Sequence, residues 1–480
     1  MENNLKHQIV SGVVWRFAER FSAQAVAFIV SLVLARLLSP HDYGTVAIVS
    51  IFVMLASVFV TNGLNAALIQ DKKAGQEEFS TIFYCNFIFA VVFYSILYFS
   101  APYIAKIYQL PELKSIIRVY GTILFPSCLR AIQEAFVSKQ MIFKKFFFST
   151  IGGTLVSAVV GIEMALYGFG CWALVAQSLT NTVIDTSILF LMVRWKPSLY
   201  FKPKKCLSLI KYGLATLGAN LIGTFFYQIQ AIVIGKKYTP SDLAFYNKGA
   251  NLPLLISSNI SGTVVSVFFP AMSNAKDKDE IKKIAKQGTR HLAYIVIPMM
   301  IGLAAVAEPL VTILFTDKWL PIVPFLRLVC IAEIIGILDA ANGLQVVRAC
   351  GRADLVFKLE FIKKPVCLII LLISMQYGVV GVASSLPIGA LFAMTVNSYA
   401  ASKFTGYKFT EELLDVMPAF TMSAIMGITV FSLSFLSLNV LLMLLLQVTI
   451  GIMLYILMSY MLKIKEFTNL CSMIAKRLKK

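Results

Sequence analysis

The sequence predicts an all-α integral membrane protein with about fourteen transmembrane helices, arranged as two six-helix lobes and a final helix pair. The first reason is composition: 58% of the 480 residues are hydrophobic and 14% are charged, whereas soluble proteins carry about 25% charged residues. The second reason is that apolar segments of spanning length recur along the whole chain. The third is that lysine and arginine accumulate in alternate loops, as in multispanning membrane proteins.

The first predicted span must bring charges into the membrane. Its apolar part, residues 21–35, is shorter than the roughly 20 residues that cross a bilayer, so the span has to include Arg16, Glu19 and Arg20. Arg16 and Arg20 share one helix face at i,i+4, and Glu19 lies beside Arg16 at i+3. An ionisable group costs at least about 2.5 kcal/mol in a bilayer core and normally faces a protein-lined or water-filled interior. We therefore expect this helix to line a cavity.

The remaining predicted spans are apolar stretches separated by polar or Pro/Gly-containing turns. The first span is centred near residue 24; it is charged and lacks a small-residue cleavage pattern, so we expect no cleavable signal peptide. An even number of spans places both termini on one side of the membrane. The other centres lie near residues 55, 90, 126, 157, 182, 222, 259, 302, 335, 366, 390, 427 and 450.

The net charge of +19 resides in the loops and predicts the orientation. Basic residues concentrate on the side of the termini, in segments 194–205 and 276–290 and in the tail from residue 476. By the positive-inside rule, both termini are cytoplasmic. Anionic lipid headgroups account for this charge, so we expect membrane lipids and not nucleic acid as its partner. The opposite loops hold few basic residues: Arg36, Lys106, Lys114, Lys236, Lys237, Lys248 and Lys318.

Internal similarity at an offset of about 200 residues predicts a duplicated chain. With six spans in each unit, the halves would be parallel repeats, as lobes 1–200 and 201–405, followed by the final two spans and basic tail in 406–480. Membrane carriers of this kind bind substrate between lobes near the midplane and rock one lobe against the other. Three segment pairs recur in order: Leu38–Gly44 with Tyr238–Asp242, Phe143–Phe146 with Phe357–Phe361, and Tyr167–Gly170 with Tyr377–Gly381.

Together with these segments, ARLLSPHDYGTVA at residues 35–47, GLNAALIQ at 63–70 and FYNKG at 245–249 carry a family resemblance. The chain resembles the polysaccharide-transporter branch of the multidrug/oligosaccharidyl-lipid/polysaccharide exporter superfamily, in particular WzxC-type Wzx flippases. The resemblance implies a bacterial inner-membrane protein that moves undecaprenyl-diphosphate-linked oligosaccharide repeat units to the periplasmic leaflet by alternating access. It also implies partners in the polysaccharide polymerase and chain-length machinery.

A carrier of a lipid-linked diphosphate needs cationic side chains in its interior, and arginine suits this task through its fixed fork of donors. The resemblance supports Arg16 and Arg20, because related flippases carry basic residues on the lumen face of the first helix. A structural alternative is ion pairing at i,i+4, of Arg130 with Glu134 or of Lys364 with Glu360. The lysines, Arg118 and Arg327 also lie close enough to a membrane face to snorkel. The cationic candidates are Arg16, Arg20, Arg118, Arg130, Lys211, Arg327, Lys363 and Lys364.

Acidic residues within the spans suggest a second role. Glu333 and Asp339 fall mid-span, and Glu163 and Asp185 lie in the first lobe. Buried carboxylates of this kind bind a proton or sodium ion for coupling, and the alternative, which we favour, is pairing with the bases named above. We expect three asparagines to hydrogen-bond between helices: Asn62, Asn65 and Asn342.

The sequence lacks the motifs of the common enzyme classes. It contains no GxxxxGK[ST] loop for ATP, no HExxH and no GxSxG, and its eight cysteines form no CxxC pair. We therefore expect no enzyme activity, no cofactor and no metal site. Three alternatives stay open: a multidrug exporter of the same superfamily, a membrane polymerase or ligase acting on lipid-linked sugars, and a lipid scramblase or membrane scaffold.

Overall fold

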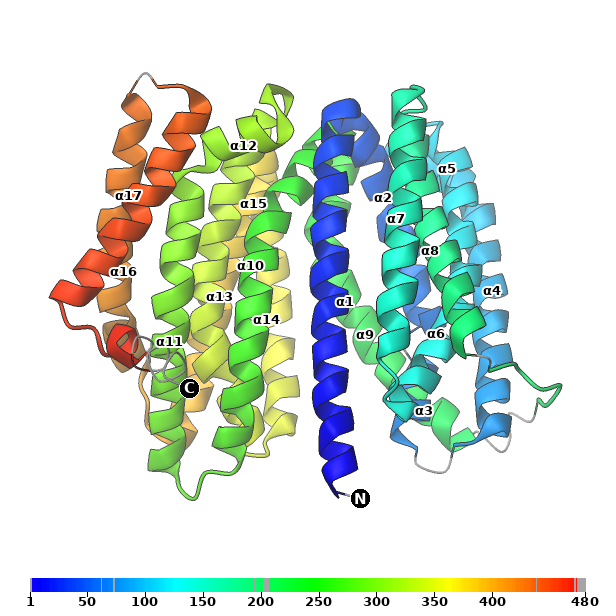
Figure 1. Cartoon of the computed structure of the whole chain (residues 1–480), viewed down its shortest axis with the longest axis horizontal. Helices are drawn as coiled ribbons and strands as arrows, with labels where there is room; N and C mark the ends of the chain where they lie inside the picture. The colour runs from blue at the N-terminus through cyan, green and yellow to red at the C-terminus, as the bar shows by residue number, and fades with distance from the viewer. Residues whose placement is uncertain are drawn as a thin grey trace. The chain divides into compact units, whose positions relative to one another are not determined.

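The computed structural model describes residues 2–61, 63–71, 74–193, 195–201, 207–436, 438–469 and 472. The described residues form α-helices and short 3-10 helices and contain no strand. Figure 1 shows the helices α1 (Glu2–Leu37), α2 (Pro40–Thr61), α3 (Gly63–Gln70), α4 (Gln76–Tyr108), α5 (Leu113–Tyr120), α6 (Leu124–Gln140), α7 (Lys144–Leu166), α8 (Cys171–Val193), α9 (Leu207–Lys237), α10 (Pro240–Ser273), α11 (Lys278–Ala305), α12 (Ala307–Phe315), α13 (Val323–Ala349), α14 (Ala353–Ser374), α15 (Gly378–Thr405), α16 (Phe409–Ser432) and α17 (Val440–Met461).

The predicted all-α membrane class is confirmed. Within the described residues, twelve helical segments are long and apolar enough to cross a membrane. One of them, Asp354–Thr405, contains both α14 and α15, and the 31-residue α9 is not among the twelve. The expected number of about fourteen therefore stays approximate. The first candidate span is Val14–Leu37, so Arg16, Glu19 and Arg20 do lie inside it.

The chain divides into two compact units, Met1–Ala244 and Phe245–Lys480. This division places α9 in the first unit, whereas the repeats predict a boundary near residue 200. The physical reason is that α9 packs against α2 and α3. The lobes 1–200 and 201–405 describe the duplication in the sequence and stay a prediction.

Two of the three repeated segment pairs adopt matching local structures. At the start of α2, the Asp42 amide donates to Ser39 Oγ at 3.2 Å, and the Ser39 amide donates to Asp42 Oδ2 at 3.0 Å. The start of α10 repeats this reciprocal cap with Thr239 and Asp242, at 3.2 and 3.1 Å. Each cap satisfies amides that the first helical turn leaves without partners.

The second matching pair is a left-handed glycine after a tyrosine. Gly168 has φ +79° and Gly378 has φ +78°, a conformation that glycine adopts without steric cost. Gly168 lies three residues before α8, and Gly378 is the first residue of α15. The third pair does not share a local structure, because Phe143 precedes α7 while Phe357 lies inside α14.

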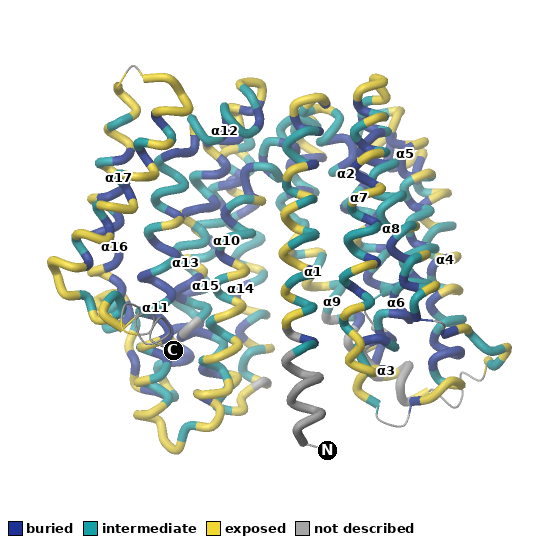
Figure 2. The backbone as a smooth tube through the Cα atoms, in the orientation of Figure 1, coloured by how far each residue is buried: buried dark blue, intermediate teal, exposed yellow. Residues whose placement is uncertain are grey.

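In the first unit, α7 packs along α8 and α1 packs along α7. Only 17% of the apolar window of α1 is buried, and Figure 2 shows that much of the described part of this helix is exposed or half-buried. Large apolar side chains such as Phe17, Phe21 and Ile29 are exposed on it. A helix with an exposed apolar surface and internal charges is typical of a membrane-embedded position beside a polar interior.

In the second unit, α13 packs against α11 and α15, and α16 packs against α11 and α17. Helix α13 is interrupted at Gly343, whose ψ of −109° lies outside the helical range. This interruption occurs next to several buried polar side chains of α15 and α16.

Candidate functional site

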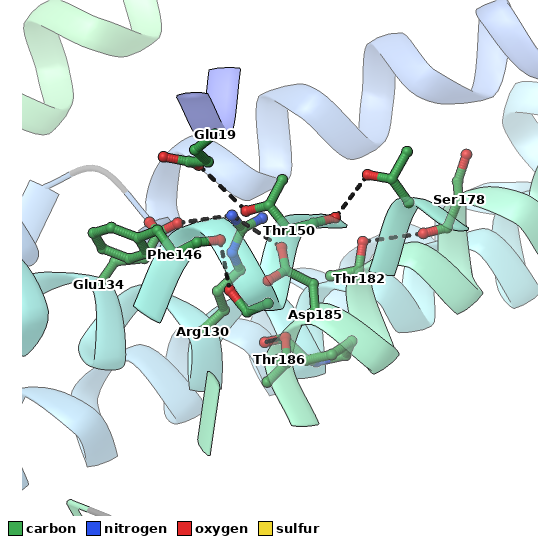
Figure 3. Close-up of polar contacts among 12 residues, drawn as sticks. Glu19, Arg130, Glu134, Phe146, Thr150, Ser178, Thr182, Asp185 and Thr186 are labelled. Atoms are coloured by element: carbon green, nitrogen blue, oxygen red, sulfur yellow. Dashed lines mark hydrogen bonds and ion pairs between the residues drawn. The ribbon is translucent and has the colours of Figure 1, made fainter. Parts of the chain in front are cut away.

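A group of charged side chains lies inside the first unit, where α1, α6, α7 and α8 meet. We call it the first-unit charge cluster; its members are Arg16, Glu19, Arg130, Glu134 and Asp185. Figure 3 shows how Glu19 points toward α7 and how Arg130 points toward Glu134 and Asp185. Packing of α1 on α7, and of α6 and α7 on α8, brings these side chains from distant parts of the sequence together.

Arg16 is paired within its own helix. Its Nη1 atom donates to Glu19 Oε2 at 2.9 Å, which is an i,i+3 pair. The guanidinium also stacks over the ring of Phe146, 4.0 Å from the ring centroid, as a cation–π contact. The second oxygen of buried Glu19 accepts a hydrogen bond from Thr150 Oγ1 at 3.2 Å. These contacts attach α1 to α7 and leave Arg16 only partly available to a ligand.

Arg130 is held by two carboxylates. Its Nη2 atom lies 3.0 Å from Glu134 Oε1 and 3.0 Å from Asp185 Oδ2. The i,i+4 pair with Glu134 was expected, and the structure confirms it. The contact with Asp185 joins α6 to α8 and could not be read from sequence spacing. Because two negative groups surround one guanidinium, Arg130 is better suited to positioning helices than to binding an anion.

Arg20 differs from the other two arginines of this region. It lies one turn beyond Arg16 on α1, its side chain is exposed, and it has no ion pair or hydrogen bond with any residue in the described part of the chain. Among the described residues, Arg16 and Arg130 therefore have acidic partners and Arg20 has none.

The structure does not bring Arg118 or Arg327 into the first-unit charge cluster. Arg118 on α5 donates from Nε to the Tyr98 carbonyl at 3.3 Å and stacks over the Tyr98 ring at 4.1 Å. Arg327 on α13 belongs to the second unit and donates to the Ala304 carbonyl at 3.1 Å and to Glu308 Oε1 at 3.3 Å. The groups that bind Arg327 lie at the end of α11 and the start of α12, whereas Tyr98 lies inside α4.

The other basic and acidic candidates have mixed outcomes. Glu360 pairs with Lys363 Nζ at 2.6 Å and more weakly with Lys364 at 3.7 Å, so the expected pair is present but Lys363 is the closer partner. Lys211 and Glu163 are exposed.

Glu333 and Asp339, the candidates for ion coupling, contact different helices. Glu333 accepts a hydrogen bond from Ser257 of α10. Asp339 Oδ2 accepts one from Asn397 of α15 at 2.9 Å. They do not form a joint site, and ion coupling stays a prediction. Among the described residues, no group of three or more His, Cys, Asp or Glu side chains has a metal-binding arrangement.

The expectation of interhelical asparagine bonds is confirmed at two positions. Asn86 on α4 donates to Asn65 Oδ1 on α3 at 3.1 Å, and Asn342 on α13 donates to Glu412 on α16 at 3.0 Å. The third position, Asn62, lies outside the described residues.

The second unit also contains an apolar groove that sequence reasoning missed. It has a volume of about 810 Å³ and is lined by side chains of α10, α11, α12, α16 and α17, among them Met299, Leu303, Val448 and Ile456. The polar ends of two lining tyrosines are bonded internally: Tyr294 to Ser459 at 2.9 Å and Tyr455 to the Tyr294 carbonyl at 2.8 Å. Hydrocarbon therefore dominates its surface. No local pattern could reveal it, because five helices contribute to it.

The comparison of folds defines the class of protein. The structure of the lipid II flippase MurJ in an inward closed conformation superposes with a TM-score of 0.76, covering 94% of this chain and 98% of that chain at 15% sequence identity. The chain therefore has the fold of a multispanning membrane transporter. Identity this low establishes the fold alone.

The comparison of sequences defines the family. The family described as polysaccharide biosynthesis protein matches residues 33–324, and the chain belongs to this family. The succinoglycan biosynthesis transport protein ExoT of Rhizobium meliloti (strain 1021) is 23% identical over 351 residues, or 73% of this chain and 71% of ExoT. The lipopolysaccharide biosynthesis protein WzxC of Escherichia coli (strain K12) is 20% identical over 370 residues, or 75% and 74%. The resemblance predicted from sequence is confirmed, and the family is one of transport proteins and not of catalysts.

Proposed function

We propose that the protein translocates an undecaprenyl-diphosphate-linked oligosaccharide across the membrane by alternating access of its two lobes, for lipopolysaccharide or exopolysaccharide assembly. Family membership supports the substrate class, since its relatives ExoT and WzxC are named for succinoglycan and lipopolysaccharide biosynthesis. The observation that carries the proposal in this chain is Arg20, an exposed arginine inside a candidate span with no acidic partner in the described part of the protein.

The chemistry of a lipid-linked diphosphate matches the charge distribution of the first unit. A diphosphate brings about two negative charges into a region of low dielectric, where a guanidinium donates paired hydrogen bonds to phosphate oxygens. Arg20 would make the first such contact. Arg16, one turn away and half-exposed, would add a second contact by turning from Glu19 toward the phosphate. Arg130 would hold α6 against α8 and stay out of contact with the substrate.

The apolar groove of the second unit suits the polyprenyl part of the same substrate. A long isoprenoid chain needs a hydrocarbon surface that extends beyond one pair of helices, and the groove offers about 810 Å³ of such space. Head-group binding and chain binding would then depend on different side chains, so substitutions can test them independently.

The proposed location is the bacterial inner membrane, with both termini in the cytoplasm. The excess of lysine and arginine in the loops on the side of the termini supports this orientation.

The test is a translocation assay with the purified full-length protein in liposomes. An undecaprenyl-diphosphate oligosaccharide in the inner leaflet becomes accessible to an added glycosidase only after translocation. We expect Arg20→Ala to lower the initial rate at least tenfold and Arg20→Lys to retain part of it. Arg352→Ala is a matched control, because Arg352 is an exposed arginine of the second unit paired with Asp354.

Full activity of the Arg16→Ala/Arg20→Ala double variant would exclude these arginines as diphosphate ligands. Failure of the wild-type protein to move any lipid-linked sugar, together with transport of a cationic drug, would favour the multidrug exporter instead.

A further inference from the structure

Five polar side chains of the second unit converge beside the interruption in α13. Glu412 Oε2 on α16 accepts hydrogen bonds from Asn342 Nδ2 on α13 at 3.0 Å and from Ser398 Oγ on α15 at 2.8 Å. Asp339 Oδ2 on α13 accepts one from Asn397 Nδ2 on α15 at 2.9 Å. Asn342, Asn397, Ser398 and Glu412 are completely buried. We call these five residues the α13–α16 oxygen cluster.

The hydrogen bond between Asp339 and Asn397 and the two hydrogen bonds that Glu412 accepts belong to one site. A Cβ atom placed on Gly343 would lie 1.8 Å from Asp339 Oδ1 and 3.1 Å from Asn397 Cβ, so the aspartate carboxylate occupies the space beside the glycine. Asn397 and Ser398 are adjacent in the chain, and each serves a different carboxylate. Asp339 is also close enough for its charge to act on Glu412.

This cluster has more acceptors than donors. Four of its buried oxygen atoms have no hydrogen-bond donor among the described residues: Asp339 Oδ1, Asn342 Oδ1, Asn397 Oδ1 and Glu412 Oε1. In a planar amide or carboxylate the two terminal atoms are only about 2.2 Å apart. Each of these four oxygens therefore lies close to the other terminal atom of the same side chain, which is hydrogen-bonded within the cluster. A buried acceptor without a donor is unfavourable unless a water molecule, a proton or a cation satisfies it.

The charge of the cluster favours a cation as the additional partner of these oxygens. It contains two carboxylates, and the groups that donate to them are neutral amides and a hydroxyl. The charge of the buried Lys363 acts on Asp339, but its ammonium group is bonded to Glu360 at 2.6 Å. Arg348 acts on Asp339 only from an exposed position. Two negative charges, one on the buried Glu412 and one on the half-buried Asp339, are costly inside a membrane protein when neither carboxylate is bonded to a cation.

We propose that the carboxylates of Asp339 and Glu412 and the amide oxygens of Asn342 and Asn397 bind a sodium ion. Carboxylate and carbonyl oxygens are ligands for hard cations, and the cluster offers neither nitrogen nor sulfur ligands. Interrupted membrane helices are the usual place for such ions in transporters, and α13 is interrupted at Gly343. Cysteine and histidine spacing could not predict this site, because its ligands are oxygens from three separate helices.

The site differs from the coupling pair expected from sequence. Glu333 faces Ser257 and takes no part, whereas Glu412 lies at the start of α16, in the final helix pair. The inference does not depend on the proposed function, because sodium binding is measured without any lipid-linked sugar. A negative result for sodium binding therefore does not affect the proposed transport function, and a negative transport assay does not affect the sodium site.

The experiment measures ²²Na⁺ binding to the purified full-length protein in detergent by equilibrium dialysis. Thermal unfolding in sodium chloride is compared with choline chloride at equal ionic strength. We expect one saturable sodium ion per chain and a Tm that rises with sodium concentration, because a ligand of the native state stabilises it. Asn397→Ala and Glu412→Gln should weaken binding at least tenfold. Glu333→Gln removes a carboxylate of α13 that lies outside the cluster, and this variant should bind sodium as the wild type does.

Several results would overturn the proposal. One is the absence of saturable ²²Na⁺ binding to the wild-type protein, a measurement that needs no variant to fold. Another is undiminished binding to the Asp339→Asn/Glu412→Gln protein. A Tm that responds to pH and not to sodium would assign the cluster to a proton, and saturation by calcium in place of sodium would assign it to a divalent ion.

Discussion

Arg130 on α6 and Asp185 on α8 form an ion pair of 3.0 Å that joins two helices of the first unit. Asp185 is almost fully buried, and Arg130 is also bonded to Glu134, whose side chain is more exposed. The arginine that sequence spacing assigned to an intrahelical pair is therefore also a connection between helices. This arrangement gives an arginine inside a membrane span two carboxylates that neutralise its charge.

We predict that Asp185→Asn destabilises the first unit. Removal of one partner from a buried pair costs about 3–5 kcal/mol, but Arg130 keeps Glu134 and is partly exposed, so we expect about 1–3 kcal/mol. The measurement is thermal unfolding of the detergent-solubilised protein, followed by fluorescence-detected size exclusion. Glu134→Gln is the control and should cost less than about 1 kcal/mol, because Glu134 is more exposed. Equal losses in the two variants would contradict a bridging role for Asp185.

Gly44 should not tolerate alanine. A Cβ atom at this position would lie 1.7 Å from the Pro240 carbonyl oxygen and 2.2 Å from its carbon, so the capped starts of α2 and α10 would have to separate. Overpacking typically costs about 1–3 kcal/mol, and a clash with backbone atoms belongs at or above the upper end. Membrane yield and Tm report the effect. Gly262→Ala on α10, where nothing lies within 4 Å, should be neutral or slightly stabilising. A stable Gly44→Ala protein would mean that this close contact is absent.

Narrowing the apolar groove should affect long lipid chains selectively. Val448 lines the groove, and Val448→Trp would fill part of it. We expect translocation of the undecaprenyl substrate to fall several-fold, while a short-chain prenyl analogue is moved at the wild-type rate. Leu445→Trp on the same helix is the matched control, because Leu445 is exposed and does not line the groove. Equal inhibition of both substrates would show that the groove does not hold the chain.

Tyr407 should make the free energy of unfolding depend on pH in the alkaline range. This residue is completely buried, and its hydroxyl donates to Asp415 Oδ2 at 2.7 Å. Burial, and then the hydrogen bond to Asp415, raise the pKa of Tyr407 above its usual value of about 10. Because the folded-state pKa is the higher one, the stabilisation is fully present below about pH 10 and is lost as the pH rises through the folded-state pKa.

Tyr407→Phe should therefore lower stability by about 1.5–3 kcal/mol at neutral pH, the usual contribution of a hydrogen bond to a charged group. The difference from the wild type should shrink above about pH 10, as measured by unfolding between pH 7.5 and 11. Tyr399→Phe, at an exposed position, serves as the control. A constant difference across this range would contradict the role of the phenol proton.

Local features of the fold were predictable because their partners are neighbours in the sequence. The caps formed by Ser39 with Asp42 and by Thr239 with Asp242 join residues three positions apart. The pairs of Arg16 with Glu19 and of Arg130 with Glu134 lie within one helical turn. In each case helix geometry alone brings the two groups together.

The sequence by itself determined the membrane class, the helical segments and the presence of charges within the spans, because these follow from apolar length and composition. Only the tertiary structure decided which charges are neutralised. It pairs Arg130 with Asp185, joins Asn342 to Glu412, and leaves Arg20 unpaired within the described residues. The reason is physical: burial and interhelical hydrogen bonds depend on how helices pack, and residues from separate helices meet at positions that no periodicity in one helix specifies.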